Sequence, residues 1–417
     1  MIRPTLNLVL LALLAGCSAC HEGASAADSS VDAGLDTATP DQRLPDALPP
    51  DWPRYGDMIF SCGGSRKRTP KPVARERGRP CGKGCRQVTF GPGVIEFEVK
   101  DDILVYAGDG PGFERHVYMV DLARDREWLI RPSLPNRPGC FSVATDGRRL
   151  AYTCAIDPGD ADRWTQTLTE YDIATHVETD RRCFDMGCED PDDASSCGCA
   201  PNGIAVGPMG ISINMSLTIC RHTDTHFYRF SDDRFTNLTE RHGGCWEGRM
   251  SGNRLVWTEI VGAYTQVMIY DTVARRKRVL APHPGSQFHP RIEGDRVVWV
   301  DHRNAPGDMV DQRNSDIYVH DLSTGKTSAV TTHPAMQDYP DVQGDWVVWE
   351  DWRNNPKPVP LYGGDFENSD VYARNMKTGE EIQLTSLPGM ELRPQIDRGR
   401  VFFDMGPVAM IALPKDR

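Results

Sequence analysis

An eleven-residue phrase that occurs twice, fifty residues apart, constrains the fold of this chain more than any other feature. Residues 294–304 read GDRVVWVDHRN and residues 344–354 read GDWVVWEDWRN. In each copy a Gly-Asp pair precedes an apolar stretch, and an Asp-x-Arg-Asn tail follows it. Self-similarity at a period of roughly 20–50 residues is typical of solenoids, propellers and other repeat architectures. The phrase therefore predicts a structural unit that the chain uses several times.

The most complete unit spans residues 287–331 and reads as short strands separated by turns. Gly-Asp pairs at 294–295 and 344–345 fall where tight hairpins need them. No stretch has sustained helical periodicity, so an all-β fold is expected. Units begin near residues 94, 138, 200, 244, 287 and 338, and a last copy near the C-terminus holds only three strands.

These units predict a β-propeller of four-stranded antiparallel blades. Seven blades is the expected number, and six is the alternative if one weak repeat is misread. The run RQVTF (86–90) can supply the fourth strand of the last blade. Closing the ring with a strand from the far end of the chain removes exposed sheet edges. The propeller is thus expected to occupy residues 86–417.

The stretch GDRVVWVDHRN…NSDIYVHDLSTGKTSAVT resembles the repeats of TolB-like β-propellers. In that family a Gly-Asp turn leads into an apolar strand, and an Asp-x-Arg, an Asp-Ile-Tyr strand and a Thr-Gly turn follow. The resemblance is strong over 287–403, moderate over 94–180 and 244–280, and poor over 183–243. It implies the fold and a binding or scaffolding role, and it does not imply a particular ligand.

The Asp-x-Arg-Asn tail has two interpretations. Asp301 ends one strand, Asp316 begins the next, and Arg303 lies between them. The same arrangement recurs at Asp351, Arg353 and Asp370. Two acids around an Arg favour a charge-assisted clamp that holds the base of each loop. The alternative is a calcium or catalytic site built from oxygens.

Aligning the units on their second strands predicts a ring of polar side chains at the mouth of the central channel. The slot is polar in all seven units, whereas a core slot would be apolar. A varied polar ring is a candidate ligand site; the alternative is a water-filled entrance without a specific ligand. The predicted ring consists of Glu96, Ser142, Asn202, Glu247, His289, Tyr339 and Arg393.

Two long loops, 304–315 and 354–369, are expected beside this mouth. Long loops on a rigid scaffold are where binding residues concentrate. Aromatic and acidic side chains there could stack on sugars or hold a peptide; otherwise they pack to hold their own loops. The candidates in the loops are His302, Trp352, Tyr362 and Asp365.

Sequence motifs favour binding over catalysis. No G-x-S-x-G, His-Glu-x-x-His or P-loop motif is present. Some propellers of the broad class that the chain resembles are polysaccharide lyases, and that resemblance casts His289, His302 and Arg303 as candidate catalytic groups. Because no His cluster has metal-ligand spacing, no catalytic residue, metal or cofactor is predicted. Calcium at the acidic loop 181–199 is a weaker alternative.

The thirteen cysteines become twelve once Cys17 is set aside, which is typical of disulfides in an exported chain. Cys140 and Cys154 lie symmetrically about the turn at 146–147, so they should face each other on antiparallel strands and form a disulfide.

The N-terminal 85 residues divide into three segments by composition. Residues 1–17 combine a basic residue and an apolar core with a Leu-Ala-Gly-Cys sequence that resembles the lipobox of bacterial lipoproteins, so Cys17 is the predicted lipidation site. Residues 18–55 are rich in Ala, Ser, Asp and Pro, as in a disordered tether. Residues 56–85 form a basic, Cys-containing segment, read either as a solvated loop or as a contact for anionic polymers or lipid headgroups.

The expected protein is a monomeric, lipid-anchored envelope propeller that binds an envelope protein or glycan at its loop-rich channel face. The alternatives are a secreted carbohydrate-active enzyme and a purely structural envelope lipoprotein. The expected location is the outer membrane, periplasmic or surface-exposed, with a membrane contact through the lipid. Nucleic acid is not expected as a partner.

Overall fold

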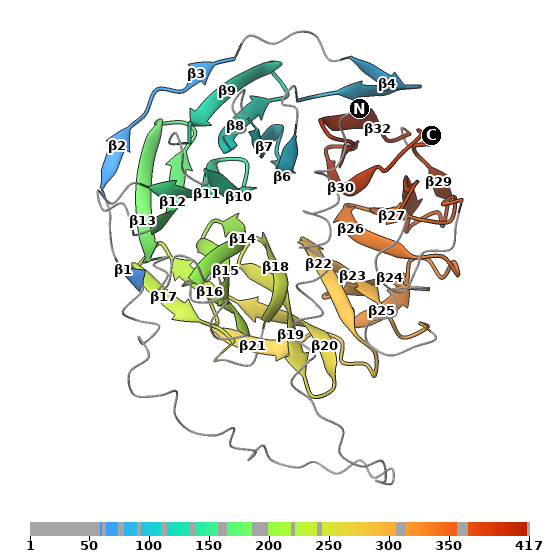
Figure 1. Cartoon of the computed structure of the whole chain (residues 1–417). Helices are drawn as coiled ribbons and strands as arrows, with labels where there is room; N and C mark the ends of the chain where they lie inside the picture. The colour runs from blue at the N-terminus through green and yellow to red at the C-terminus, as the bar shows by residue number, and fades with distance from the viewer. Residues whose placement is uncertain are drawn as a thin grey trace, which may run out of the picture.

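The computed structural model of the chain describes residues 59–60, 64–73, 79–89, 93–109, 115–133, 139–156, 165–185, 199–217, 222–239, 244–305, 314–356 and 366–414. Within these ranges the chain is all-β and forms seven antiparallel sheets arranged as blades around a central axis (Figure 1). The predicted seven-bladed propeller is therefore confirmed, and the six-bladed alternative is wrong.

Each of the first six blades is built on four consecutive strands, ordered from the axis outward. The first three blades are β6 (Val94–Lys100), β7 (Ile103–Asp109), β8 (Arg115–Asp121) and β9 (Arg126–Arg131); β10 (Cys140–Thr145), β11 (Arg149–Ile156), β12 (Thr165–Asp172) and β13 (Val177–Asp185); and β14 (Cys199–Gly207), β15 (Gly210–Leu217), β16 (His222–Arg229) and β17 (Arg234–Asn237).

The next three blades follow the same order. They are β18 (Gly244–Ser251), β19 (Arg254–Val261), β20 (Tyr264–Asp271) and β21 (Arg276–Val279); β22 (Gln287–Glu293), β23 (Arg296–Asp301), β24 (Asp316–Asp321) and β25 (Lys326–Ala329); and β26 (Gln337–Gln343), β27 (Trp346–Asp351), β28 (Asp370–Asn375) and β29 (Glu381–Gln383).

Blade 7 closes the ring with strands from both ends of the described chain. It consists of β30 (Leu392–Asp397), β31 (Arg400–Asp404) and β32 (Val408–Ala412), joined by β5 (Cys85–Gln87) and β4 (Pro80–Gly82). The register pairs Gln87 with Ala409 and Arg86 with Met410. The amide of Val88 then donates to the carbonyl of Val408 at 2.7 Å. Closure of blade 7 by a strand from the N-terminal side is thus confirmed, and the structure gives this strand as Cys85–Gln87.

The core lies between blades. The buried apolar side chains form seven clusters, and each cluster joins one neighbouring pair of blades around the ring. Trp299 packs on residues of blade 4 such as Val256 and Ile269, and Trp349 packs on residues of blade 5 such as Val300. The repeated apolar strand of the opening phrase is therefore an inter-blade contact.

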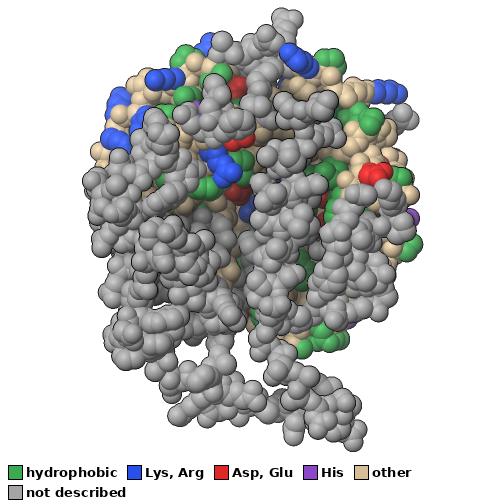
Figure 2. Space-filling view, viewed as in Figure 1, with side chains coloured by type: hydrophobic (Ala, Val, Ile, Leu, Met, Phe, Trp, Pro, Cys, Tyr) green, Lys and Arg blue, Asp and Glu red, His purple; other side chains and the backbone are tan. Residues whose placement is uncertain are grey.

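The basic segment before the propeller runs along the outer edges of three blades as a strap, defined here by its described residues 59–60, 64–73 and 79–82. Strands β1 (Ile59–Phe60) and β2 (Ser65–Lys67) pair with β13, β3 (Lys71–Pro72) pairs with β9, and β4 extends blade 7. Lys and Arg side chains gather along the upper rim of the molecule, where these strap strands lie (Figure 2). The segment therefore covers sheet edges that would otherwise be exposed.

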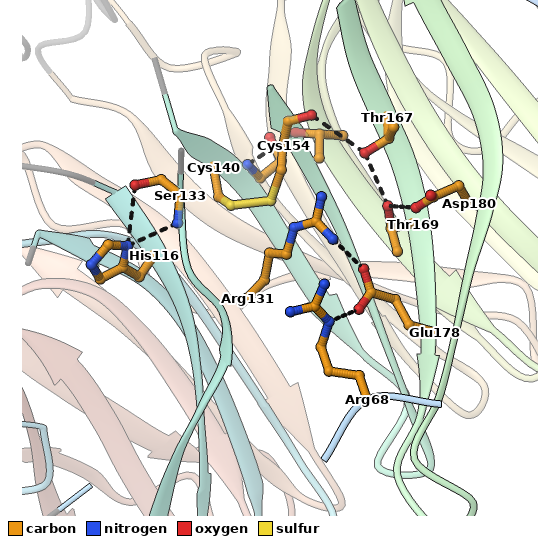
Figure 3. Close-up of a disulfide and its surroundings, with 12 residues drawn as sticks. Arg68, His116, Arg131, Ser133, Cys140, Cys154, Thr167, Thr169, Glu178 and Asp180 are labelled. Atoms are coloured by element: carbon orange, nitrogen blue, oxygen red, sulfur yellow. Dashed lines mark hydrogen bonds and ion pairs between the residues drawn. A yellow bond between two sulfur atoms is a disulfide. The ribbon is translucent and has the colours of Figure 1, made fainter. Parts of the chain in front are cut away.

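Glu178 anchors the strap to the ring. Its side chain is fully buried and forms ion pairs with Arg66 at 2.5 Å, with Arg131 at 2.5 Å and with Arg68. Arg66 and Arg68 belong to the strap, and Arg131 ends β9 of blade 1 (Figure 3). One carboxylate therefore joins the strap, blade 1 and blade 2.

Two disulfides join described residues. Cys140 and Cys154 are direct partners across β10 and β11, with an S–S bond of 2.01 Å and a Cα–Cα distance of 4.0 Å, as predicted (Figure 3). Cys81 and Cys85 form a second bridge within the β4–β5 hairpin, which was not predicted. Cys17 and the predicted tether 18–55 lie outside the described residues. Among the described residues, no helix is long and apolar enough to span a membrane.

Replacing Glu178 with Gln should lower the free energy of unfolding by about 2–4 kcal/mol, because three guanidinium groups lose a buried carboxylate. Urea unfolding with the disulfides intact measures this change, and protease cleavage within 64–73 should become faster. Glu380→Gln, at an exposed turn, is the matched control. Equal stability of the two variants would show that the strap is held by backbone pairing alone.

Candidate functional site

Every innermost strand carries a β-bulge where it approaches the channel mouth. Pairing between the first and second strands shifts register at this point in all seven blades. In blades 5, 6 and 7 two residues on the inner strand oppose one large aromatic residue, which is Trp299, Trp349 or Phe403. Bulges re-aim side chains and are frequent beside functional sites.

Three of the predicted ring residues occupy equivalent bulge positions and have the same unusual backbone. His289, Tyr339 and Arg393 have φ angles of +47°, +44° and +51°. Non-glycine residues rarely adopt this left-handed region, and a β-branched or bulky residue is strained there. Each is followed by a proline, which fixes the backbone on the other side of the bulge. The strain is thus repeated in three successive blades.

His289 and Tyr339 contact each other across the gap between blades 5 and 6. Their rings stack with centroids 4.1 Å apart and an interplanar angle of 14°. Asp338 holds both residues, because its Oδ1 lies 2.5 Å from His289 Nδ1 and accepts the Tyr339 amide at 2.7 Å. The His289 and Asp338 side chains are 24% and 15% exposed, so this group meets solvent at the mouth.

Arg393 joins blade 7 to both of its neighbours. Its amide donates to Glu350 Oε1 of blade 6, and its guanidinium donates to the Ile95 carbonyl of blade 1 at 2.6 Å and to Asp404. Burial, with the negative charge of Asp338 in second place, raises the pKa of Glu350 to about 8. Sequence reasoning missed both Glu350 and Asp338, although both lie beside residues that it singled out.

The other predicted ring residues are placed differently. Ser142 is buried, and its Oγ accepts the Gly203 amide at 2.9 Å. Phe141, one residue earlier, is level with His289, because the hairpin turn 146–149 is two residues longer than the Gly294-Asp295 turn. The alignment that put Ser142 in this slot is therefore wrong by one residue.

Like His289, Glu96 lies four residues before the last paired residue of its strand. It nevertheless pairs with Ala107, because the bulge of blade 1 falls at Ile95. Asn202 and Glu247 lie in β14 and β18, and only their backbone is described. The described part of the ring is thus concentrated in blades 5, 6 and 7.

Deeper in the channel, charged side chains from several blades approach one another. Lys100 of blade 1 donates to Glu293 of blade 5 at 2.5 Å, so this ion pair joins blades that are not neighbours. Glu98 and Asp341 are partly buried; Glu98 lies close to the positive charges of Arg249 and Arg291, and Asp341 lies close to those of Arg291 and Lys100. A ligand entering at the mouth would therefore meet a charged plug rather than an open pore.

The Asp-x-Arg tails form the predicted clamp twice. Arg303 Nε and Nη2 donate to the two oxygens of Asp301 at 2.8 and 2.7 Å, and Trp299 donates its indole N–H to the same carboxylate at 2.8 Å. Arg353, Asp351 and Trp349 repeat these contacts. Each guanidinium also lies over a tyrosine ring of the third strand. The Arg binds only the first acid of each pair.

The second acid has a different environment. Asp316 accepts one bond from Asn304 Nδ2 at 2.7 Å, while its Oδ1 is buried without a hydrogen-bond partner. Asp370 repeats this arrangement with Asn354 at 2.8 Å. Burial raises the pKa of Asp316 to about 6, with the charge of Asp301 adding to the effect. Burial also opposes ionisation of Asp301, but the bonds from Arg303 and Trp299 outweigh it and hold its pKa below the usual value.

The two described loop candidates are buried at the bases of their loops. His302 is 9% exposed and lies 4.9 Å from the Phe288 ring, and Trp352 is 5% exposed and meets Phe366 edge-on. Tyr362 and Asp365 lie outside the described residues. His302 and Trp352 therefore present little of their own surface to a ligand.

The described residues contain no group of three or more His, Cys, Asp or Glu side chains that could hold a metal ion. The clamp oxygens do not form one, since Arg and Trp donors occupy Asp301, and the Asn304 amide occupies one oxygen of Asp316. No step through a metal is derived from this part of the chain.

Fold and site together define the chain as a seven-bladed propeller with a polar channel mouth. No family model matches the sequence, and no curated protein matches it either.

Solved structures match at the level of the fold. An oligogalacturonate lyase in complex with manganese superposes with a TM-score of 0.52 at 14% identity, covering 85% of this chain and 99% of that one. The oligogalacturonate lyase from Vibrio parahaemolyticus gives 0.52 at 12% identity, over 86% and 98%. The propeller domain of the Trilobed protease from Pyrococcus furiosus gives 0.50 at 10%, over 76% and 90%. At these identities the likeness concerns the fold alone.

Two isosteric substitutions on one clamp should have opposite effects. Asp301→Asn should cost about 2–3 kcal/mol, because Arg303 and Trp299 lose a buried carboxylate. Asp316→Asn should stabilise by about 1 kcal/mol above the folded-state pKa, where the wild-type group is charged and buried.

The sign of the Asp316 effect sets its pH dependence. Because its pKa is raised on folding, the wild-type protein loses stability as pH rises from the usual value of 3.8 to about 6. Urea midpoints at about pH 4 and pH 7.5 measure this: the Asp316→Asn gain should be absent at the lower pH and present at the higher. A gain that is equal at both would contradict a buried, titrating Asp316.

Proposed function

We propose that this chain is a lipid-anchored envelope propeller that binds a protein or glycan partner at its channel mouth. The observation that carries the proposal is the set of strained bulges in blades 5, 6 and 7. His289, Tyr339 and Arg393 share a left-handed backbone that costs about 1 kcal/mol or more each, and none of the three belongs to an apolar cluster between blades. Such strain clusters at ligand sites, where the side chains must be aimed in a direction that a regular strand does not allow.

The chemistry of the mouth supports recognition. The stacked His289–Tyr339 pair offers the edges of two aromatic rings. Asp338, Arg393 and Asp404 surround this pair with fixed hydrogen-bonding groups. Rigid aromatic and Arg side chains held by neighbours are typical anchors of protein interfaces, and aromatic faces with acids are typical of sugar sites. The charged plug below the mouth keeps a ligand at this face.

The anchoring part of the proposal is supported by the sequence. The segment that resembles a lipobox at Cys17, the acidic tether 18–55 and the even number of remaining cysteines all fit export with retention at a membrane. The two disulfides among the described residues agree with an oxidising compartment.

A second candidate is a carbohydrate-active enzyme that uses the same mouth. The His289–Asp338 contact favours it, since a histidine oriented by a carboxylate is a common general base. This function would produce an unsaturated, ultraviolet-absorbing product from acidic polysaccharides. A broad panel that gives no such product would leave the binding role.

Substitutions at the three bulges should abolish partner binding without unfolding the propeller. His289→Asn, Tyr339→Asn and Arg393→Asn keep a residue type that tolerates the left-handed backbone. Each should weaken the affinity for a partner recovered by pull-down by at least about tenfold. Titration calorimetry with the purified partner measures the change.

Lys326→Ala on the exposed outer strand β25 is the matched control and should bind like the wild type. Full affinity in all three bulge variants would remove the mouth as the binding face. A deletion strain in which only envelope integrity changes, with no partner recovered, would instead favour a purely structural envelope role.

A further inference from the structure

One rung of the mouth differs in chemistry from its equivalents in the other blades. A rung is defined here as the residue just before the bulge of an inner strand together with the residue that faces it on the second strand. Its occupants in blades 1 to 7 are Val94–Gly108, Cys140–Cys154, Pro201–Met215, Cys245–Thr258, Phe288–Val300, Asp338–Glu350 and Leu392–Asp404. Only blade 6 places two carboxyl groups directly opposite each other.

Two facing carboxylates are unfavourable on adjacent strands. Side chains of directly opposed residues lie about 4.5–5.5 Å apart at Cβ, and like charges there destabilise the pair. Glu350 is 2% exposed, so water screens it little. A single acid on this rung is neutralised elsewhere: Asp404 of blade 7 accepts from the Arg393 guanidinium. Around the Asp338–Glu350 rung, the positively charged groups are fewer than the acidic groups: His289 and Arg393 face Asp338, Glu350 and Asp404.

The charged groups around the rung come from three blades. His289 on β22 contacts Asp338, and Arg393 on β30 meets Glu350 through its backbone amide, not its guanidinium. The Arg393 guanidinium is committed to Asp404 on β31 and to the Ile95 carbonyl of blade 1, close to the charge of Glu96. Burial and the charge of Asp338 therefore outweigh the attraction that Arg393 and His289 exert on a charged Glu350.

We propose that the Asp338–Glu350 rung is a proton-binding site, so that the charge of the channel mouth changes by one as pH passes through the neutral range. Two facing carboxyl groups whose charges repel each other lose their protons one after the other and titrate as a pair. Of the two, Glu350 is the buried member and holds the proton; Asp338 is the exposed member and stays available to His289. The direction of the Glu350 pKa agrees with this assignment.

The consequence for binding rests on the function proposed above. At low pH the mouth would present a neutral Glu350, and at high pH a second negative charge beside Asp338. A partner with a positive group would then bind better as pH rises, and a partner with a negative group would bind better as it falls.

The proton itself can be measured without any partner. Infrared difference spectra of the ligand-free protein separate a protonated carboxyl group from a carboxylate. Between about pH 6 and pH 9.5, wild-type minus Glu350→Gln spectra should show one carboxyl band that is lost with a midpoint close to pH 8. A Glu350 band already lost below about pH 5.5, or never present, would overturn the proposal.

Coupling to Asp338 is tested by a second variant, which also serves if Glu350→Gln fails to fold. Asp338→Asn removes the opposing charge, so the Glu350 midpoint should fall by at least about one pH unit, a tenfold change in proton affinity. The control is Glu391, a buried acid of blade 7 whose pKa burial raises to about 7. Its band, identified with Glu391→Gln, should not respond to Asp338→Asn. An unmoved Glu350 midpoint would contradict a shared proton, whatever the outcome of the partner-binding experiment.

Discussion

Ring closure is the constraint on which the rest of this molecule depends. Each blade exposes apolar side chains on both sheet faces, and each of the seven core clusters needs two neighbouring blades. A ring left open would therefore expose two apolar faces at once. The pairing of β5 with β32 prevents this, because it completes the fourth position of blade 7 and positions Val88 in the cluster between blades 7 and 1. The strap follows from the same closure: once β5 is fixed, the preceding chain lies beside the outer edges of blades 7, 1 and 2.

The channel mouth uses the one irregularity that this architecture repeats. A regular inner strand would alternate its side chains between the two blade interfaces, leaving few to point along the axis. One extra residue at the bulge changes this direction without changing the pairing farther along the strand. The large aromatic residue opposite the bulge, such as Trp299, fills the space beneath it, and its indole is fixed by Asp301. The same bulge therefore both packs Trp299 in the core and directs His289 toward the mouth.

Sequence periodicity predicted the blades, their order, the closing strand and the Cys140–Cys154 bridge, because each follows from strand alternation and turn position. The strap could not be found in this way. Its strands have two or three residues, and those of β2 and β3 are all exposed, so they carry no apolar pattern. Ser142 was misplaced by one residue because the hairpin of blade 2 has a longer turn, which composition does not reveal. Asp338 and Glu350 were missed since their importance lies in facing each other across strands, a relation that only the register shows.

Buried carboxylates in this propeller behave in two ways, and the difference lies in whether a guanidinium reaches them. Asp301 and Asp351 each accept two hydrogen bonds from an Arg and one from an indole N–H, and these contacts hold the loop bases in one geometry. Asp316 on β24 of blade 5 and Glu350 on β27 of blade 6 instead accept from amides, the side-chain amide of Asn304 and the backbone amide of Arg393. A hydrogen bond from an amide does not offset the loss of hydration of a full charge in a buried site. In this fold a bidentate Arg lowers the pKa of Asp301, whereas burial raises the pKa of Asp316 and Glu350, which accept from amides; Glu350 is the one of the two that faces Asp338 at the mouth, where pH is proposed to act.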